Sequence, residues 1–371
     1  MLRYRIENRC RRLKYRLFGE RAEGVVPVEV SNSAEIEMRY RGVVTRTLVE
    51  TAGMSCLEPK HLVEDNTTTL RPFHRGCESV LLDITNPTFS FREHVLVDPD
   101  RKVIFSEGFP ASNVLMFRRF LPADCRKISG TVAYLSNTWV DNYYHWMQLT
   151  LPLLRLYQKL APEVSIDAYY VGRSRLVKVQ EETLAVFGVR PEQIIREPCQ
   201  AERLLSVIYQ HRPQYEDMRY RDPWGHEFIR QTFCQPPDPS FPKRIYVQRG
   251  NVPNRRLTND PQVTAFLQSL GFVPVRMDGL TVAEQAKMFA GADVMIGVHG
   301  AGLTNLIFAR KGAKVIELFP PEVQEPGMFT AATHSELDYY FLLGCSGGSK
   351  HVGDFTISTE KLSALLKLAG V

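Results

Sequence analysis

The chain has 371 residues, of which 44% are hydrophobic and 23% charged, and its formal net charge is +5. These proportions are typical of a globular protein and exclude a disordered, fibrous or collagen-like chain. The length indicates two domains, each long enough to bury a core of its own.

The positive charge is concentrated at the start of the chain. Residues 1–21 hold eight arginine or lysine side chains and two glutamates, whereas the rest of the chain is close to neutral. A nucleic-acid-binding protein usually carries its basic side chains on the folded body, so we expect no nucleic-acid partner. Apolar residues recur at helical spacing in the same segment. They indicate either an amphipathic helix on an anionic membrane surface or a solvated helix packed against the body.

The seven cysteines are odd in number, widely scattered and never arranged as C-x-x-C. They indicate neither a disulfide framework nor a zinc site, and a reducing compartment is the simpler interpretation. The sequence contains no apolar run of about 18 residues, and its basic start lacks the apolar core of a secretory signal. We therefore expect a cytoplasmic protein, either free or peripheral on the inner membrane face.

The first half of the chain has mixed signals. Short strand-like runs (SVLLDI, EHVLV, KVIFS, GTVAYLS) occupy residues 45 to 135. A helix at 142–160, a strand at 166–172, a helix at 178–188 and a strand at 204–210 follow. Asp98-Pro99-Asp100 matches a metal-binding D-x-D pattern, but a proline between two aspartates is more typical of a hairpin turn.

The second half is more regular. Strands RIYVQ, FVPVRM, DVMIGV and KVIELF alternate with helices NDPQVTAFLQSLG, TVAEQAKMFAGA and GLTNLIFAR, which predicts an α/β fold with a parallel sheet covered on both faces. We divide the chain into a basic arm, an α/β domain, a proline-rich linker, a Rossmann-like domain and a last helix, at residues 1–22, 23–234, 235–243, 244–358 and 359–371.

The strongest local signal is the run Gly297-Val298-His299-Gly300-Ala301-Gly302, which leaves a buried strand and opens a helix. Glycines allow a ligand close to the backbone, and a helix N-terminus attracts anions, so we predict a diphosphate or other anion site. His299 either donates to a phosphate oxygen or braces the loop. The position of the third glycine in a dinucleotide fingerprint holds Asn305, which disfavours a dehydrogenase.

Two further groups lie at the same predicted sheet edge. Arg249, Arg255, Arg256 and Asn259 follow the strand RIYVQ, and guanidinium groups there can grip phosphate in bidentate fashion. A solvated turn would also explain Arg256. Glu317 ends the strand KVIELF, where a carboxylate can accept from ribose hydroxyls. Together these residues predict a nucleotide or nucleotide-sugar site.

A third constellation, Asp141-Asn142-Tyr143-Tyr144-His145-Trp146, lies in the first half. Aromatic and polar side chains suit a sugar ring, and His145 near a helix start could act as a general base. The aromatic residues could equally be packing residues, and His145 a core histidine.

The ordered motifs resemble glycosyltransferase family 61, which includes bacterial surface-polysaccharide transferases, plant xylosyl- and arabinosyltransferases and animal O-GlcNAc-type transferases. The resemblance runs from about residue 75 to 345. Its motifs are YYHW with a following Leu-Pro, the arginine group ending at Asn259-Asp260, the run GVHGAGL and the segment VIELFP. Leu149 and Leu153 stand where the family often has an acidic residue and an arginine, and Asp260 stands where it usually has glutamate.

The resemblance implies a GT-B fold, two facing Rossmann-like domains with the active site in the cleft. It also implies an inverting, metal-independent transfer from a nucleotide sugar, commonly a uridine diphosphate sugar, to a glycan or lipid-linked glycan. We expect donor binding by Arg249, Arg255, Asn259, Gly297, His299, Gly300, Ala301, Gly302 and Glu317. We expect His145 as the base with Asp141 as alternate, acceptor contacts from Asn142, Tyr144 and Trp146, and no metal or other cofactor. A nucleotide-sugar epimerase, a silent glycan- or nucleotide-binding relative and a nucleic-acid-binding protein remain as alternatives.

Overall fold

The computed structural model describes residues 126–371, apart from short gaps at 137–139, 173, 198, 211–222, 251–253, 322–324 and 347–352. Before residue 126 it describes the segments 24–25, 29–31, 44–48, 60–62, 78–90, 96–97, 102–104 and 121–122. The basic arm and Asp98-Pro99-Asp100 lie outside the described residues. Within the described ranges, no helix is both long and apolar enough to cross a membrane.

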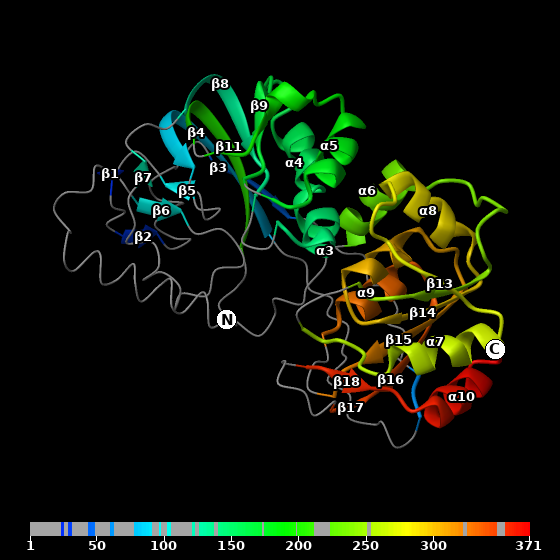
Figure 1. The fold of residues 1–371 in the computed structure, drawn as a ribbon. Coiled ribbons are helices and arrows are strands. Elements are labelled where there is room, and N and C mark those ends of the chain that lie inside the picture. Colours follow the sequence, from blue (N-terminus) through cyan, green and yellow to red (C-terminus); the bar gives the residue numbers. More distant parts are fainter. Residues whose placement is uncertain are drawn as a thin grey trace, which may run out of the picture.

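The C-terminal half contains a five-stranded sheet whose strands are all parallel (Figure 1). In chain order the strands are β12 (Arg244–Val247), β13 (Val273–Val275), β14 (Val294–Val298), β15 (Lys314–Phe319) and β16 (Asp338–Leu343). Their order across the sheet is β13-β12-β14-β15-β16. The predicted parallel sheet is therefore confirmed in this half, with β16 as a strand that the sequence analysis did not predict.

Helices cover both faces of this sheet. They are α7 (Asp260–Ser269), α8 (Val282–Gly291), the 3₁₀ helix η5 (Ala301–Phe308), α9 (Gly327–His334) and α10 (Thr359–Leu368). Successive residues of β12 point to opposite faces: Ile245 packs in the core with residues of α8, η5 and α9, and Tyr246 in the core with α7 and α10. The last helix is thus part of this domain. Helix α8 begins with a capping box that Thr281 and Glu284 form.

The sheet of the first half is mixed. Its main strands are β4 (Glu78–Ser90), β8 (Arg126–Tyr134), β9 (Ala168–Tyr170), β10 (Ile194–Ile195) and β11 (Cys199–Gln210). Strand β11 pairs antiparallel with β4 and parallel with β8, and β8, β9 and β10 pair in parallel. The prediction of a Rossmann-like sheet here was therefore wrong in part, because antiparallel strands extend the parallel segment.

Short strands complete the described sheets. They are β1 (Gly24–Val25), β2 (Glu29–Ser31), β3 (Val44–Leu48), β5 (Leu96–Val97), β6 (Lys102–Ile104), β7 (Leu121–Pro122), β17 (Cys345–Ser346) and β18 (Phe355–Thr356). The pairs β1–β7 and β17–β18 form separate two-stranded ribbons, whereas the other short strands join the mixed sheet.

The predicted helix at 142–160 is interrupted. It consists of α3 (Tyr143–His145), the π-helical turn η3 (Trp146–Thr150) and α4 (Leu153–Leu160). The backbone N–H of Leu151 donates to the carbonyl of Trp146 at 2.8 Å, the i to i+5 bond of a π turn. Further helices of this half are α5 (Val177–Ala185), the 3₁₀ turn η4 (Pro191–Gln193) and α6 (Pro223–Phe233), the last of which was not predicted.

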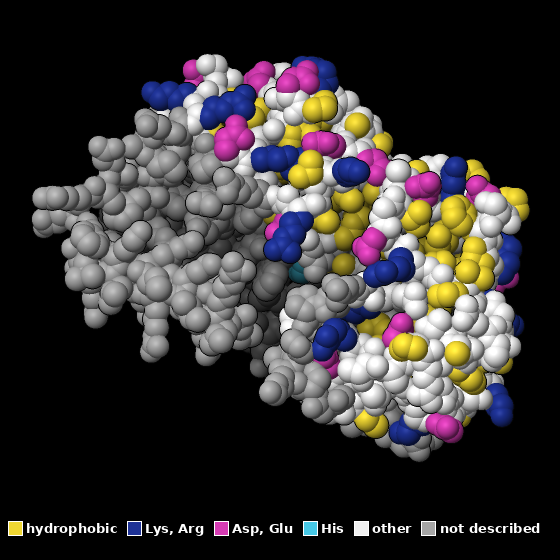
Figure 2. All heavy atoms as spheres, viewed as in Figure 1, with side chains coloured by type: hydrophobic (Ala, Val, Ile, Leu, Met, Phe, Trp, Pro, Cys, Tyr) yellow, Lys and Arg dark blue, Asp and Glu magenta, His cyan; other side chains and the backbone are white. Residues whose placement is uncertain are grey.

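The two halves meet through α3 and α6. Helix α6 precedes the proline-rich segment but packs against α8, α9 and η5 as well as η3. The hydroxyl of Tyr143 donates to Oδ1 of Asn305 at 2.9 Å, and Nδ2 of the same asparagine donates to Gln285 at 2.7 Å. Figure 2 shows basic and acidic side chains interspersed over the described part of this face, in keeping with the near-neutral body.

We expect Tyr143→Phe to destabilise the protein by about 1–2 kcal/mol, because it leaves a buried acceptor on Asn305 without its donor. The measurement is the midpoint of urea unfolding followed by fluorescence. Tyr169→Phe is the control, since no hydrogen bond is recorded for its hydroxyl among the described residues. Equal midpoints for both variants would contradict a stabilising role of the Tyr143 bond.

Candidate functional site

The first predicted cluster gathers at the carboxyl ends of β12 and β14. The order of the sheet places β13 and β14 on opposite sides of β12. Where connections diverge in this way, the ends of parallel strands leave a crevice for a ligand. Arg249 follows β12 and His299 follows β14, and Nη1 of the arginine donates to the carbonyl oxygen of the histidine at 2.6 Å. The structure therefore brings these two residues together.

Gly300 makes this approach possible. Its backbone is extended, with φ of 166°, so an ordinary residue could adopt the conformation. A methyl group on its Cα, however, would lie 2.0 Å from Nη1 of Arg249. Glycine is required here by the space that the guanidinium occupies, and η5 begins directly after it. The first turn of η5 adds backbone N–H groups and the positive end of a helix dipole.

Two arginines share this crevice. Burial and the neighbouring charge of Arg255 lower the pKa of Arg249 to about 10, so it is still a cation at neutral pH. Burial also lowers the pKa of Arg255, while Glu325 and Glu317 oppose that shift. Nε of Arg249 is buried and has no hydrogen-bond partner among the described residues. Two partly desolvated cations with unused donors form a site for an anion.

Arg255 adopts a left-handed backbone conformation, with φ of 57°. A non-glycine residue in this region costs of the order of 1–3 kcal/mol, and such residues concentrate at ligand sites. The backbone strain is consistent with a side chain that the fold holds in one place.

His299 is anchored by Glu317, whose own position is fixed by Tyr339. Nδ1 of His299 lies 2.6 Å from Oε1 of the carboxylate, and the tyrosine hydroxyl donates to Oε2 at 2.6 Å. The imidazole also stacks on Phe319, with ring centroids 4.9 Å apart. Because Glu317 is fully buried and both its oxygens accept protein donors, the predicted ribose contact does not fit this geometry. The carboxylate orients the histidine instead.

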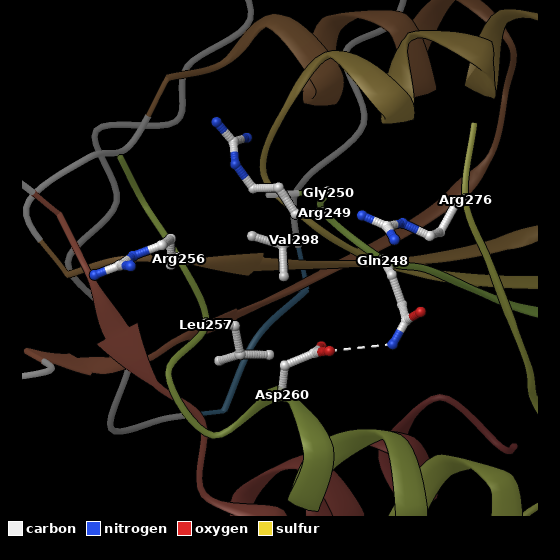
Figure 3. A pocket seen from close by; sticks show the side chains of 8 residues that line it. All are labelled: Gln248, Arg249, Gly250, Arg256, Leu257, Asp260, Arg276 and Val298. Atoms are coloured by element: carbon white, nitrogen blue, oxygen red, sulfur yellow. Dashed lines mark hydrogen bonds between the residues drawn. The ribbon is translucent and has the colours of Figure 1, made fainter. Parts of the chain in front are cut away.

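A pocket of about 290 Å³ adjoins this cluster (Figure 3). Its lining residues are Gln248, Arg249, Gly250, Arg256, Leu257, Asp260, Arg276 and Val298. The side chains of Val298 and Leu257 form the apolar part of the pocket wall. Asp260 accepts hydrogen bonds from Gln248 and Tyr246. Arg276 is exposed and has no recorded hydrogen bond within the described part of the chain, so its donors are available to a ligand.

Two residues of the arginine group have structural partners. Arg256 binds Asp354 through its backbone N–H and two side-chain donors, so the turn interpretation holds for this residue. The amide of Asn259 donates to the carbonyl of Ile357 and accepts from its N–H. The predicted donor contact of Asn259 does not fit these hydrogen bonds, because its side chain fastens the segment before α10.

The other small residues of the loop serve packing. A methyl group on Gly297 would lie 2.7 Å from a side-chain carbon of Leu303, and one on Gly302 would lie 3.2 Å from Val247. These two glycines let η5 lie close to β12 and β14. Ala301 is half-buried at the first position of η5. Gly300 makes room for Arg249 instead, so close approach of a ligand to the backbone of this loop stays a prediction.

Most of the predicted acceptor-side residues hold α3 in place. The indole of Trp146 is fully buried and donates to Thr183 at 3.0 Å, which contradicts a contact with a sugar. Asn142 caps α3 by accepting from the N–H of Tyr144 at 2.9 Å. Tyr144 is buried, and its hydroxyl lies 2.7 Å from the place where a methyl group on Gly327 would be. Helix α3 is thereby fixed against both η5 and the start of α9.

His145 ends α3 directly before the π turn. It is half-buried, and the ring of Tyr144 meets it edge-on at 5.5 Å. Asp141 is exposed, and its carboxylate accepts from the backbone N–H of Arg175. Among the residues that the structure describes, no three His, Cys, Asp or Glu side chains are grouped to hold a metal ion.

Sequence reasoning missed Tyr339, Gln248 and Arg276. The first lies in the unpredicted strand β16, where Phe341 pairs with Glu317 and Tyr339 stands two residues earlier on the same face. If the apolar run DYYFLL had been predicted as a strand parallel to KVIELF, this pairing would have placed Tyr339 near Glu317. Gln248 and Arg276 follow β12 and β13, and the rule that ligands bind at carboxyl ends of parallel strands would have selected both.

We expect Gly300→Ala to weaken pyrophosphate binding about tenfold while leaving the fold intact. The added methyl group displaces only the flexible end of Arg249, and one charge-assisted hydrogen bond is worth about 1.5 kcal/mol. Titration calorimetry measures the affinity and circular dichroism the fold. Gly225→Ala in α6 is the control, because its methyl group would make ordinary contacts of 3.5 Å. An unchanged affinity in Gly300→Ala would show that this loop does not shape the anion site.

Comparison with known proteins agrees with these observations. Residues 143–316 match the family described as Glycosyltransferase 61, a range that runs from the start of α3 into β15. A β-1,2-xylosyltransferase of Oryza sativa subsp. japonica is 39% identical over 80 residues, which cover 21% of this chain and 14% of that protein. An α-1,3-arabinosyltransferase of the same plant is 34% identical over 83 residues, with the same two shares of 21% and 14%.

A β-1,2-xylosyltransferase of Arabidopsis thaliana is 28% identical over 91 residues, which cover 24% of this chain and 16% of that protein. The matched segments thus span less than a fifth of the length of these relatives. The family match contains His145, Arg249, Arg255 and the whole glycine loop. Residues 143–316 of this chain are therefore similar to glycosyltransferase family 61.

Proposed function

We propose that this protein transfers a sugar from a nucleotide sugar to a hydroxyl of a glycan or lipid-linked glycan, with inversion and without a metal. The donor class that we propose is a uridine diphosphate sugar, and the names of the relatives favour a pentose. The observation that carries the proposal is the crevice at β12 and β14, where Arg249, Arg255 and His299 gather in a glycosyltransferase 61 domain.

The crevice suits the departing diphosphate. Sugar transfer breaks the bond between the anomeric carbon and a phosphate oxygen, so negative charge develops on that oxygen. The two guanidinium groups and the N-terminal end of η5 place positive charge there before the reaction begins. Cationic side chains in a partly desolvated site act strongly because water does not screen them. The adjoining pocket of about 290 Å³ then receives the nucleoside.

In this proposal the general base belongs to the first half of the chain. Inversion requires the acceptor hydroxyl to attack from the side opposite the diphosphate, so the group that removes its proton belongs on the facing domain of a GT-B arrangement. His145 lies on the short helix that joins that half to η5 through Tyr143. An imidazole titrates near neutral pH, which suits a general base.

A silent relative that binds nucleotide without turnover is the second candidate. It is favoured by Leu149, which stands in the π turn where the resemblance implied an acidic side chain. Binding measurements alone do not separate it from a transferase, whereas turnover of a donor sugar does.

We expect Arg249→Ala to lower the affinity for UDP about 10- to 100-fold, because it removes a cation and its charge-assisted hydrogen bonds. The measurement is titration calorimetry in buffer that contains EDTA. Arg244→Ala is a matched control at the amino end of the same strand, where Nη1 donates to Leu270. A wild-type affinity in Arg249→Ala would refute the donor site, and wild-type binding abolished by EDTA would refute metal independence.

We expect His145→Ala to lower turnover about 10²–10⁴-fold with unchanged UDP binding, which is the usual contribution of a general base. The assay follows release of UDP from the donor sugar. Asp141→Asn tests the alternate base, because asparagine keeps the acceptor for Arg175 and removes only the charge. Loss of turnover in Asp141→Asn with normal turnover in His145→Ala would transfer the role to the aspartate.

A further inference from the structure

Three buried side chains form a continuous hydrogen-bonded chain across the C-terminal sheet. It begins at Tyr339 on the edge strand β16, passes through Glu317 on β15 and ends at His299 after β14. These residues are 2%, 0% and 4% exposed, and both hydrogen bonds are 2.6 Å long. The chain thus connects a strand outside the family match to the crevice at Arg249.

A buried hydrogen-bonded chain of this kind contributes little to the free energy of unfolding. Burial of a carboxylate is costly unless every lone pair finds a partner, and an apolar cluster in its place is often as stable. Glu317 lies between apolar strand residues, where a leucine or valine would pack without this cost. The polar chain therefore indicates a role at the end that lies beside Arg249, which is the imidazole of His299.

The carboxylate selects one form of that imidazole. An ionised carboxylate only accepts hydrogen bonds, so Nδ1 of His299 carries the proton in this pair. The other ring nitrogen, Nε2, has no hydrogen-bond partner among the described residues. A carboxylate beside a histidine also stabilises the imidazolium, in which Nε2 becomes a donor suited to a phosphate oxygen.

Tyr339 fixes the orientation of the Glu317 carboxylate. Its hydroxyl holds Oε2, which leaves Oε1 for the histidine and fixes the plane of the carboxylate. Burial, and then the charge of Glu317, raise the pKa of Tyr339 well above its usual value, so the phenol stays a donor throughout the neutral range.

We propose that Tyr339 is a positioning residue that acts through Glu317 to hold the ring of His299 in the orientation from which it contacts the diphosphate of the ligand. The identity of that ligand rests on the proposed function, whereas the coupling of the three side chains does not. Among the described residues, Arg249 holds the carbonyl oxygen of His299, the charge of Arg255 interacts with Glu317, and the charge of Glu325 interacts with Tyr339.

The first test compares Tyr339→Phe with Tyr340→Phe by NMR of the histidine ring nitrogens without ligand. Tyr340 is the next residue of β16 and also loses a hydroxyl bond, to Asp338. We expect the titration midpoint of His299 to move by about half a pH unit or more, in either direction, only in Tyr339→Phe. Equal midpoints in wild type and both variants would overturn the coupling.

A second variant guards against misfolding of Tyr339→Phe. Glu317→Gln keeps the shape but removes the charge that favours the imidazolium, so we expect the His299 midpoint to fall. We then expect Tyr339→Phe to have no further effect in the Glu317→Gln background. Independent, additive shifts would show that the tyrosine does not act through the carboxylate.

The last arm measures UDP affinity against pH. In wild type we expect the affinity to fall as pH rises through the His299 midpoint, because the donor at Nε2 is lost. That fall should shift in Tyr339→Phe and not in Tyr340→Phe. If wild type does not bind UDP, the proposed function fails while the NMR result still decides the coupling. If wild type binds UDP and both variants match its pH profile, the positioning role fails while the donor site stands.

Discussion

A guanidinium group held partly out of water is the constraint on which the rest of the site depends. Arg249 is partly buried next to Arg255, and the fold must offset both the lost hydration and the mutual repulsion of the two cations. The carbonyl oxygen of His299 supplies one compensating bond, and Gly300 supplies the room for it. The remaining donors have no protein partner in the described chain, so an anion completes the arrangement.

The parallel sheet provides the rigidity that this arrangement requires. Strands β12 and β14 are buried on both faces, and the two cores on either side fix where each strand ends. The histidine loop is held from the side by a buried carboxylate, and the glycines at 297 and 302 let η5 pack directly on the strands. Each contact that positions the loop is therefore made to a strand or to the helix that follows it.

Local sequence signals located most of these elements. Buried parallel strands such as KVIELF and DVMIGV read as continuous apolar runs, and the rule for carboxyl ends placed Arg249 and the glycine loop at one edge. The signals failed where a partner lies far along the chain. Asn259 bonds to Ile357, which is 98 residues away, and the bonds of Glu317 depend on a strand that was not predicted. Spacing within a motif carries no information about such pairs.

The same limit explains the aromatic motif of the first half. Tyr143, Tyr144 and Trp146 share one short segment, and yet one bonds to η5, one reaches α9 and one is buried under α5. The residue types of this segment suggested a sugar-binding surface, whereas in the structure each of the three aromatic side chains contacts a different neighbouring element. His145 lies between them and is half-buried, and its role as the general base stays a prediction.

The π turn at Trp146–Thr150 sets the direction in which that histidine is presented. An α-helix advances about 100° for each residue, and a π turn accommodates one residue more than an α turn. The extra residue therefore rotates α3 relative to α4 by about that angle. Helix α4 packs on its own sheet while α3 meets the opposite half, and a single backbone insertion reconciles the two orientations. The segment would tolerate most substitutions better than the loss of one residue, because a deletion would restore a regular helix and turn Tyr143 and His145 away from their present neighbours.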